Sequence, residues 1–129
     1  MFSHVMVGSN HIERSRRFYD ALFGAIGGKP GRTDDRGRLL YVRNGSAFMV
    51  STPIDGQSAT RGNGSTIGFN FDSPEQVKDW HDAGASAGGT SIEDPPGYRE
   101  SAFGKMYLAY LRDPDGNKLC GYYRVPADA

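Results

Sequence analysis

The feature that most constrains the fold is a strand–helix–strands pattern that occurs twice along the chain. The first copy begins at 2–7, a segment rich in β-branched and aromatic residues that we expect to be a strand, and continues with a helix from Asn10 to Gly24. The second copy begins at 66–71 and continues with a helix after Ser73. Each copy alone would leave a sheet face uncovered. The halves are therefore expected to pack as one domain or to exchange between subunits.

Both predicted helices carry local start signals. Asn10, with Glu13 three residues later, has the pattern of a capping box. Ser73 is a preferred N-cap residue, Pro74 suits the first helical position and Gln76 completes a second capping box. Residues at helical spacing predict one buried stripe on each helix: Ile12, Ser15, Phe18, Tyr19, Leu22 and Phe23 on the first, and Val77, Trp80, Gly84 and Ala87 on the second.

The rest of the first copy contains two clear strands. Segments 39–42 and 47–50 are apolar, and Asn44-Gly45 between them is a strong hairpin signal. Segment 25–35 contains glycine and proline and has room for only a short edge strand.

The second copy ends with three predicted strands. These are 90–93, 106–111 and 118–123, with the last two joined by the turn 113–117. This turn reads Asp-Pro-Asp-Gly-Asn, in which proline presets one backbone angle and glycine permits a positive one. The polar stretch 94–105 contains Pro95-Pro96-Gly97 and is predicted to be a loop, which either covers a cleft or is an ordinary exposed connection.

The size of the chain fits a single α+β domain. Its 129 residues are short for two domains and long enough to bury a core without disulfides. We place the first βαβββ module at 1–52, a polar connection at 53–64 and the second module at 65–124.

Composition excludes several classes of partner. Lysine and arginine total 15 and aspartate and glutamate total 15, so the chain lacks the basic surplus that favours nucleic acid or a membrane surface. No apolar stretch approaches the length of a membrane span, and the N-terminus lacks the pattern of a signal peptide. Cys120 is the single cysteine, which suits the reducing cytoplasm.

Four segments, taken in order and with their spacing, point to a family. They are 2–9, 13–20, 62–69 and 110–118, and the last contains the Asp-Pro-Asp-Gly-Asn turn. Together they resemble the vicinal oxygen chelate superfamily, which includes glyoxalase I, bleomycin-resistance proteins, fosfomycin-resistance transferases and extradiol dioxygenases. The likeness covers nearly the whole chain. It specifies a fold but not a reaction, because this fold hosts several.

The resemblance implies a particular architecture. Two βαβββ modules are expected to form a curved mixed sheet around a cleft, within one chain or between two, and the protein is expected to be a homodimer. Many members bind a divalent metal through a histidine on the first strand, a histidine that opens the second module and a glutamate on the final strand. Glyoxalase I adds a glutamate from the last strand of its first module.

Only one of these implied ligands is present. His4 matches the first, whereas Thr66 and Cys120 stand where the second histidine and the final glutamate are expected, and 48–50 offers no carboxylate. A catalytic divalent site normally keeps about three protein ligands, and a thiolate would favour zinc or copper. We therefore predict no cofactor. A divalent metal held by His4 and Cys120 is the alternative.

The candidate ligands also have ordinary structural interpretations. His4 is expected to be a neutral, hydrogen-bonded histidine in a polar cavity. Cys120 is expected to be a small buried apolar residue. His11 and His81 are expected to be solvated surface residues, and Thr66 is simply a good strand residue.

A ligand cleft needs apolar walls and a few placed polar groups. The candidates for the walls are aromatic residues on predicted strands, of which alternation places only about half on one face: Tyr41, Phe48, Phe69, Phe71, Tyr107, Tyr110, Tyr122 and Tyr123. Tyr98 and Arg99 lie in the predicted covering loop, and Arg99, like any surface arginine, could meet an anionic ligand. The predicted ligand-binding residues are His4, Thr66, Tyr98, Arg99, Tyr107, Cys120 and Tyr122.

Three functions are compatible with these residues. The first is binding of a small, partly aromatic or amphipathic compound, as resistance proteins do, with a degraded metal site. The second is a metal-dependent glyoxalase-like lyase or dioxygenase that uses His4 with substituted ligands. The third is a structural or partner-binding dimer with no open cleft.

Overall fold

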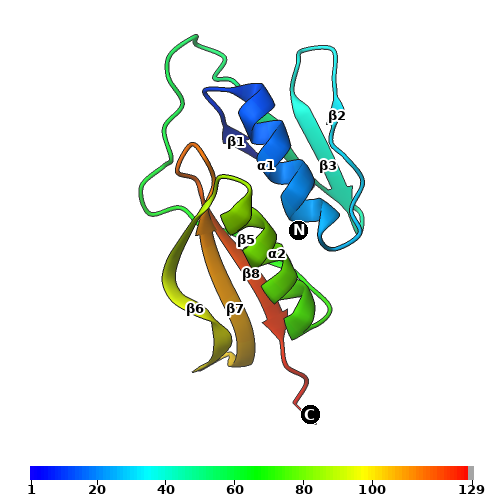
Figure 1. The fold of residues 1–129 in the computed structure, drawn as a ribbon, viewed down its shortest axis with the longest axis vertical. Coiled ribbons are helices and arrows are strands. Elements are labelled where there is room, and N and C mark those ends of the chain that lie inside the picture. The colour runs from blue at the N-terminus through cyan, green and yellow to red at the C-terminus, as the bar shows by residue number, and fades with distance from the viewer. Residues whose placement is uncertain (128–129) are drawn as a thin grey trace.

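The computed structural model describes residues 1–127 and shows two βαβββ modules (Figure 1). The first module contains β1 (His4–Gly8), α1 (Ile12–Gly24), β2 (Arg32–Thr33), β3 (Leu39–Arg43) and β4 (Ser46–Ser51). The second contains β5 (Ile67–Asn70), α2 (Pro74–Ser86), β6 (Thr90–Ser101), β7 (Gly104–Arg112) and β8 (Lys118–Arg124). The predicted α+β fold with a doubled module is confirmed.

The two modules share one sheet topology. The strand order is β1-β4-β3-β2 in the first sheet and β5-β8-β7-β6 in the second. In each, the first strand lies parallel to the fourth and the other pairs are antiparallel. We expected one curved sheet. Within residues 1–127 the strands instead form two four-stranded sheets with no hydrogen-bonded pairing between them.

Contact between the helices joins the modules into one core. Figure 1 shows α1 and α2 running side by side, each against its own sheet. Gly84 on α2 permits this approach, because a Cβ there would lie 2.5 Å from Leu111 Cδ1 and 2.7 Å from Leu22 Cδ1. The largest side chains with no exposed surface come from these elements: Trp80, Tyr19, Phe18, Leu22, Leu39 and Leu111.

The sequence predicts the cap of α2 correctly and the cap of α1 incorrectly. Ser73 Oγ accepts from Gln76 N at 3.1 Å, and Pro74 opens α2 as expected. The predicted Asn10 cap is wrong, since His11 occupies the N-cap position without a side-chain capping bond. The amide of Asn10 instead bonds both backbone groups of Ala59, in the connection between the modules. Asn10 therefore bonds a residue that is distant in the sequence and does not cap its own helix.

The predicted loop 94–105 is also wrong, because β6 continues through most of it. The strand runs from Thr90 to Ser101, with an irregularity between Ile92 and Gly97. Both prolines lie in this bulge, where they need not donate to the ladder, and Glu93 takes a positive φ of 59°. The segment is therefore part of a sheet and not a mobile cover.

His81 was expected on the surface but is only 7% exposed. Its Nε2 lies 2.8 Å from Ser91 Oγ on β6, and its Nδ1 lies 3.1 Å from Asp82 Oδ1. The reason is that α2 packs against β6 as well as β7 and β8, which widens its buried stripe. In the part of the chain that the structure describes, none of the helices is long and apolar enough to cross a membrane.

Candidate ligand-binding cleft

The two sheets each have a face turned away from the helices, which we call the open face. On the first sheet, Val7, Phe48 and Val50 point into the core, so their strand neighbours occupy the open face. The open-face residues are His4, Met6, Ala47, Met49, Leu40 and Val42. His4 and Met6 are exposed, and this face is mainly apolar.

The open face of the second sheet carries a small cluster of its own. Cys120 packs there with Met106 and Leu108, beside Tyr110 and Tyr122. The backbone partners of Cys120 and Tyr122 on β5 are Gly68 and Asn70, both exposed. Thr66, just before β5, is also exposed. The structure therefore brings Cys120 and Tyr122 together on one face, as strand alternation indicates.

The state of the Cys120 thiol follows from its surroundings. Burial raises the pKa of Cys120 to about 11, so the side chain is a neutral thiol at physiological pH. Its Sγ donates to the Gly121 carbonyl at 3.5 Å.

Tyr98 and Tyr107 lie on the other side of the second sheet. They pair directly across β6 and β7, and their rings meet edge to face with centroids 5.0 Å apart. Tyr107 packs against the main core, so neither tyrosine joins Cys120. Arg99 pairs with Met106 and so shares the Cys120 face, but its Nη2 donates to the Pro95 carbonyl at 2.9 Å. Arg99 thus holds the bulge of β6.

The donor set does not fit the divalent-metal site that the family implies. His4 is exposed and its Nδ1 lies 2.8 Å from Ser3 Oγ, Thr66 offers only a neutral hydroxyl, and Cys120 packs in an apolar cluster. Within residues 1–127, no three His, Cys, Asp or Glu side chains are grouped so that they could hold a metal ion. The chain by itself lacks the three ligands that a catalytic site needs.

A cleft of about 1140 Å³ opens at one end of the first sheet. It lies where β1 and β4 begin and β3 ends, and β5 of the second module forms its far wall. Among the predicted ligand-binding residues, His4 lines this cleft, whereas Thr66, Cys120 and Tyr122 do not. Of the aromatic residues that the sequence suggests for a cleft wall, Tyr41, Phe48 and Phe69 line it. The sequence did not show which of the candidates lie together, because the walls come from both modules.

Aromatic side chains form the apolar wall of the cleft. Phe69 on β5 meets Phe48 at 5.2 Å and Phe23 at 5.3 Å between ring centroids, both edge to face. Tyr41 continues the wall, 5.1 Å from Phe23. These four side chains line the cleft and also belong to the packed core or its margin. The wall is therefore rigid, as a preformed ligand site requires.

A short segment after α1, residues 28–32, forms one side of the cleft, and we call it the basic strap because it carries Lys29 and Arg32. The backbone N–H of Gly31 donates to Asp20 Oδ1 at 2.8 Å, and Arg16 Nη1 donates to the Gly31 carbonyl at 3.1 Å. A Cβ at Gly31 would lie 2.5 Å from Tyr41 Cζ, so only glycine allows this contact.

The side chain of Tyr41 helps to hold the basic strap in place. Its hydroxyl donates to Asp20 Oδ1 at 2.7 Å, the same oxygen that receives the Gly31 N–H. Burial and this bond raise the pKa of Tyr41 well above its usual value, so it remains a donor. The cleft wall, the strap and α1 are thus tied through one carboxylate.

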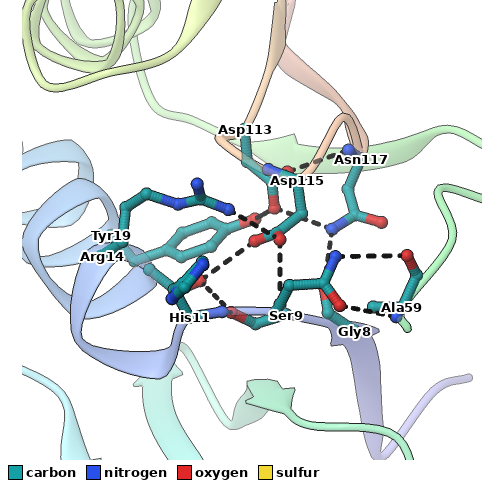
Figure 2. A network of polar contacts seen from close by, with 11 residues as sticks. Gly8, Ser9, His11, Arg14, Tyr19, Ala59, Asp113, Asp115 and Asn117 are labelled. Carbon is teal, nitrogen blue, oxygen red and sulfur yellow. Dashed lines mark hydrogen bonds and ion pairs between the residues drawn. The ribbon is translucent and has the colours of Figure 1, made fainter. Parts of the chain in front are cut away.

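The opposite end of β1 is closed by a polar cluster, shown in Figure 2. At its centre, Tyr19 OH donates to Asp113 Oδ2 at 2.6 Å, and Asn117 donates to Asp113 from both its backbone N and its Nδ2. Desolvation raises the pKa of Asp113 and, well above its usual value, that of Tyr19. Asp113 and Asn117 are both buried.

A second carboxylate links this turn to the start of α1. Asp115 Oδ1 accepts from Asn10 N and Arg14 Nη2, each at 2.9 Å, and Ser15 Oγ donates to Oδ2 at 3.3 Å. Asn117 Nδ2 also donates to the Gly8 carbonyl at 3.0 Å. We call Ser9, Arg14, Ser15, Tyr19, Asp113, Asp115 and Asn117 the closing cluster. It fixes the β7–β8 turn of the second module onto the first.

The sequence predicts segment 113–117 only as a turn. A signal of the larger role is present, since the turn carries three side chains with carboxylate or amide groups while proline and glycine already supply its geometry. The partners are missed because they lie 94 to 109 residues away along the chain.

Comparison with known proteins places the chain in a family. Residues 1–120 match the Glyoxalase/Bleomycin resistance protein/Dioxygenase superfamily, and the protein belongs to it. The resemblance inferred from the four sequence segments is therefore confirmed. A search of curated proteins finds no match.

Solved structures agree. A glyoxalase/bleomycin resistance protein from Albidiferax ferrireducens T118 is 56% identical, with a TM-score of 0.92 over 96% of this chain and 99% of that one. A glyoxalase/bleomycin resistance protein/dioxygenase family enzyme from Burkholderia phytofirmans PsJN is 21% identical, with a TM-score of 0.72 over 95% and 98%. A glyoxalase-related enzyme from Fulvimarina pelagi is 20% identical, with a TM-score of 0.71 over 100% and 94%. The last two share the fold alone.

Proposed function

We propose that this protein binds a small organic molecule in the cleft between its first module and β5. The observation that carries the proposal is the cleft itself, which combines a volume of about 1140 Å³ with a wall of Phe23, Tyr41, Phe48 and Phe69. Ligand sites are concave, largely apolar and preformed, with a few polar groups that fix orientation. The polar groups here include His4, Asn44 and Asn70.

Binding is favoured over metal-dependent chemistry by the donor set. A lyase of the glyoxalase type needs a carboxylate base beside the metal, and an extradiol dioxygenase needs two histidines and one carboxylate. His4 is the one family ligand present, and Cys120 is a neutral buried thiol. Metal analysis of protein purified without chelator separates the two functions. Stoichiometric metal that is lost in His4→Ala would favour the enzyme.

The experiment that tests binding blocks the cleft. Gly68 lines it and has an ordinary φ, and a Cβ at this position would have no neighbouring atom within 4 Å, so Gly68→Trp is expected to fill the space without disturbing the fold. Gly24 is equally unobstructed but does not line the cleft, which makes Gly24→Trp the matched control. Compounds that raise the melting temperature of the wild type and of Gly24→Trp should fail on Gly68→Trp. Equal responses from all three proteins would reject the cleft as the site.

We further propose that the protein is a homodimer. Support comes from the open face of the first sheet, where Met6 is 41% exposed and lies beside Met49 on β4, both outside the residues that line the cleft. An apolar surface of this kind marks an interaction site, and a second copy would cover it. Light scattering of Met6→Glu/Met49→Glu, which changes two open-face residues outside the cleft, should give a monomer where the wild type gives a dimer. A monomeric wild type would contradict the proposal. The cytoplasm remains the location we infer from the single unpaired cysteine.

A further inference from the structure

The charges that line the cleft are all of one sign. Lys29, Arg32 and Arg43 line it together with His4, and none of the lining residues is an aspartate or a glutamate. The chain as a whole has equal numbers of acidic and basic residues, 15 of each. The cleft thus carries a local excess of positive charge on a neutral protein, beside an aromatic wall.

Two of these three cations form no ion pair within the described residues, and the third, Arg43, is partly engaged, with its Cζ 5.5 Å from the centroid of the Phe71 ring. Among the described residues, Lys29 and Arg32 take part in none of the ion pairs within 4.0 Å. Arg43 reaches Asp72 only at 3.5 Å and Gln76 Oε1 at 3.4 Å, both at the limit of hydrogen bonding. The Nε of Arg43 is buried and has no hydrogen-bond partner within residues 1–127. The guanidinium therefore keeps unused donors.

The neighbouring carboxylate that would neutralise the strap is already engaged. Asp20 receives the Tyr41 hydroxyl and the Gly31 N–H, and it does not line the cleft. Its role is to hold the basic strap in place, with Arg16 holding the Gly31 carbonyl. The strap is therefore a fixed element that presents Lys29 and Arg32 to the cleft without an internal counterion. Preorganised charge of this kind selects ligands by sign.

We infer that the ligand of this cleft is an organic anion, with an apolar body against Phe23, Tyr41, Phe48 and Phe69 and an acidic group that meets Lys29, Arg32 or Arg43. This inference rests on the proposed binding function and adds the chemical class of the ligand. It excludes cationic ligands, because a positive group in the cleft would face Lys29 and Arg32 with no carboxylate in the lining to pair with.

Two fluorescent probes with the same ring system test the inference. Anilinonaphthalene sulfonate carries one negative charge, and N-phenylnaphthylamine is its neutral counterpart. We expect the anionic probe to bind at least about tenfold more tightly than the neutral one, a preference that shrinks in high salt. Gly68→Trp should weaken both probes, which ties their binding to the cleft.

Charge variants test which residues cause the preference for the anionic probe. Lys29→Gln/Arg32→Gln should reduce affinity for the anionic probe about tenfold and leave the neutral probe unchanged, and Arg43→Gln should reduce it less, because Arg43 is partly paired. The control is Arg17→Gln/Arg36→Gln, which removes the same net charge from two exposed residues outside the cleft. Circular dichroism verifies that each variant is folded.

The outcomes separate the two proposals. If neither probe binds, or if Gly68→Trp leaves both unchanged, the proposed cleft function fails. If both probes bind with equal affinity, the cleft function stands and the anion inference is overturned. A preference for the anion that persists in Lys29→Gln/Arg32→Gln/Arg43→Gln, or that falls equally in the control, also overturns it.

Discussion

The two ends of β1 meet the second module in opposite ways. At Gly8 the β7–β8 turn closes over the strand with buried carboxylate and amide groups. At His4 the strand opens onto a cleft of about 1140 Å³. The strand has only five residues, so the difference arises from what the second module brings to each end.

The contrast is sharpest between two turns in equivalent places. The β7–β8 turn, 113–117, and the β3–β4 turn, Asn44-Gly45, each join the third and fourth strands of a module. The first directs Asp113, Asp115 and Asn117 into the other module, and the second has positive φ at both residues and sends no side chain across. Only Arg43, beside the short turn, reaches Asp72 and Gln76. The short β3–β4 turn thus leaves space open at its end of the first module, whereas the long polar β7–β8 turn fills the equivalent space.

Because of this difference, we assign stability to the closed end of β1 and binding to the open end. The closing cluster fixes the relation of the modules, so the other end can remain open without loosening the domain. Networks of buried hydrogen bonds rigidify a structure, whereas a binding site needs unfilled space. We therefore expect substitutions at the closed end to reduce stability and substitutions at the open end to reduce binding.

The largest effect is expected from Asp113→Ala. This change strands the buried hydroxyl of Tyr19 and removes the acceptor of Asp115 N and Asn117 N. We expect a loss of about 3–5 kcal/mol in the free energy of unfolding, measured in urea, since several buried donors lose their partner together. A loss below about 1 kcal/mol would show that the closing cluster does not fix the modules.

The pH dependence of Asp113→Asn provides the control for charge. Burial raises the pKa of Asp113, so the folded state holds its proton more tightly than the unfolded state does. The contribution of this carboxyl is therefore fully present below its ordinary pKa and falls as pH rises through the folded value. The stability advantage of the wild type over Asp113→Asn should shrink between pH 4 and pH 7, as judged from urea curves. An advantage that grows with pH would contradict the direction of the shift.

At the open end, Gly31→Ala is expected to have the next largest effect. The new Cβ would lie 2.5 Å from the ring of Tyr41, which is buried and held by Asp20, so the basic strap must move. Overpacking of this kind costs about 1–3 kcal/mol. Calorimetry should show this loss, and titration with the anionic probe should show weaker binding. Unchanged anion binding would mean that the position of the strap is unimportant.

The sequence predicted those parts of the fold that local signals determine. Ser73 and Pro74 mark the start of α2, and Asn44-Gly45 forms the tight turn that its residue types favour, with φ of 49° and 83°. Helical spacing also identified the buried stripes, including Tyr19 and Trp80. These features depend on neighbours a few residues apart, which is the range over which sequence patterns are informative.

The parts that the sequence did not predict depend on distant contacts. Pro95 and Pro96 argued against a strand, but the bulge of β6 places them outside the ladder. Asn10 has a good local pattern for a cap, yet Ala59 occupies its side chain. The cleft exists because Phe69 packs against Phe23, 46 residues earlier in the chain. A single sequence gives no sign that these two residues pack together.

A matched pair of tyrosine variants compares the two ends directly. Tyr19 OH donates to Asp113 at 2.6 Å and Tyr41 OH donates to Asp20 at 2.7 Å, so each Tyr→Phe change removes one bond to a carboxylate. Tyr19 has no exposed surface, and we expect Tyr19→Phe to cost about 2 kcal/mol and Tyr41→Phe about 1 kcal/mol in urea unfolding. The reverse order would show that the open end carries more of the stability than its geometry indicates.

The smallest effect is expected from Asp72→Ala, which removes the exposed partner of Arg43. Asp72 is 76% exposed on its side chain and lies 3.5 Å from Arg43, so solvent screens the pair and stability should change by less than about 0.5 kcal/mol. Removing this carboxylate also frees the Arg43 guanidinium, so affinity for the anionic probe should stay the same or rise by about twofold. Unchanged or higher probe affinity in Asp72→Ala, together with a large loss of stability in Asp113→Ala, would show that the two carboxylates have opposite roles. If Asp72→Ala instead weakened the anionic probe, Arg43 would need its partner in order to face the cleft, and the open end would resemble the closed one.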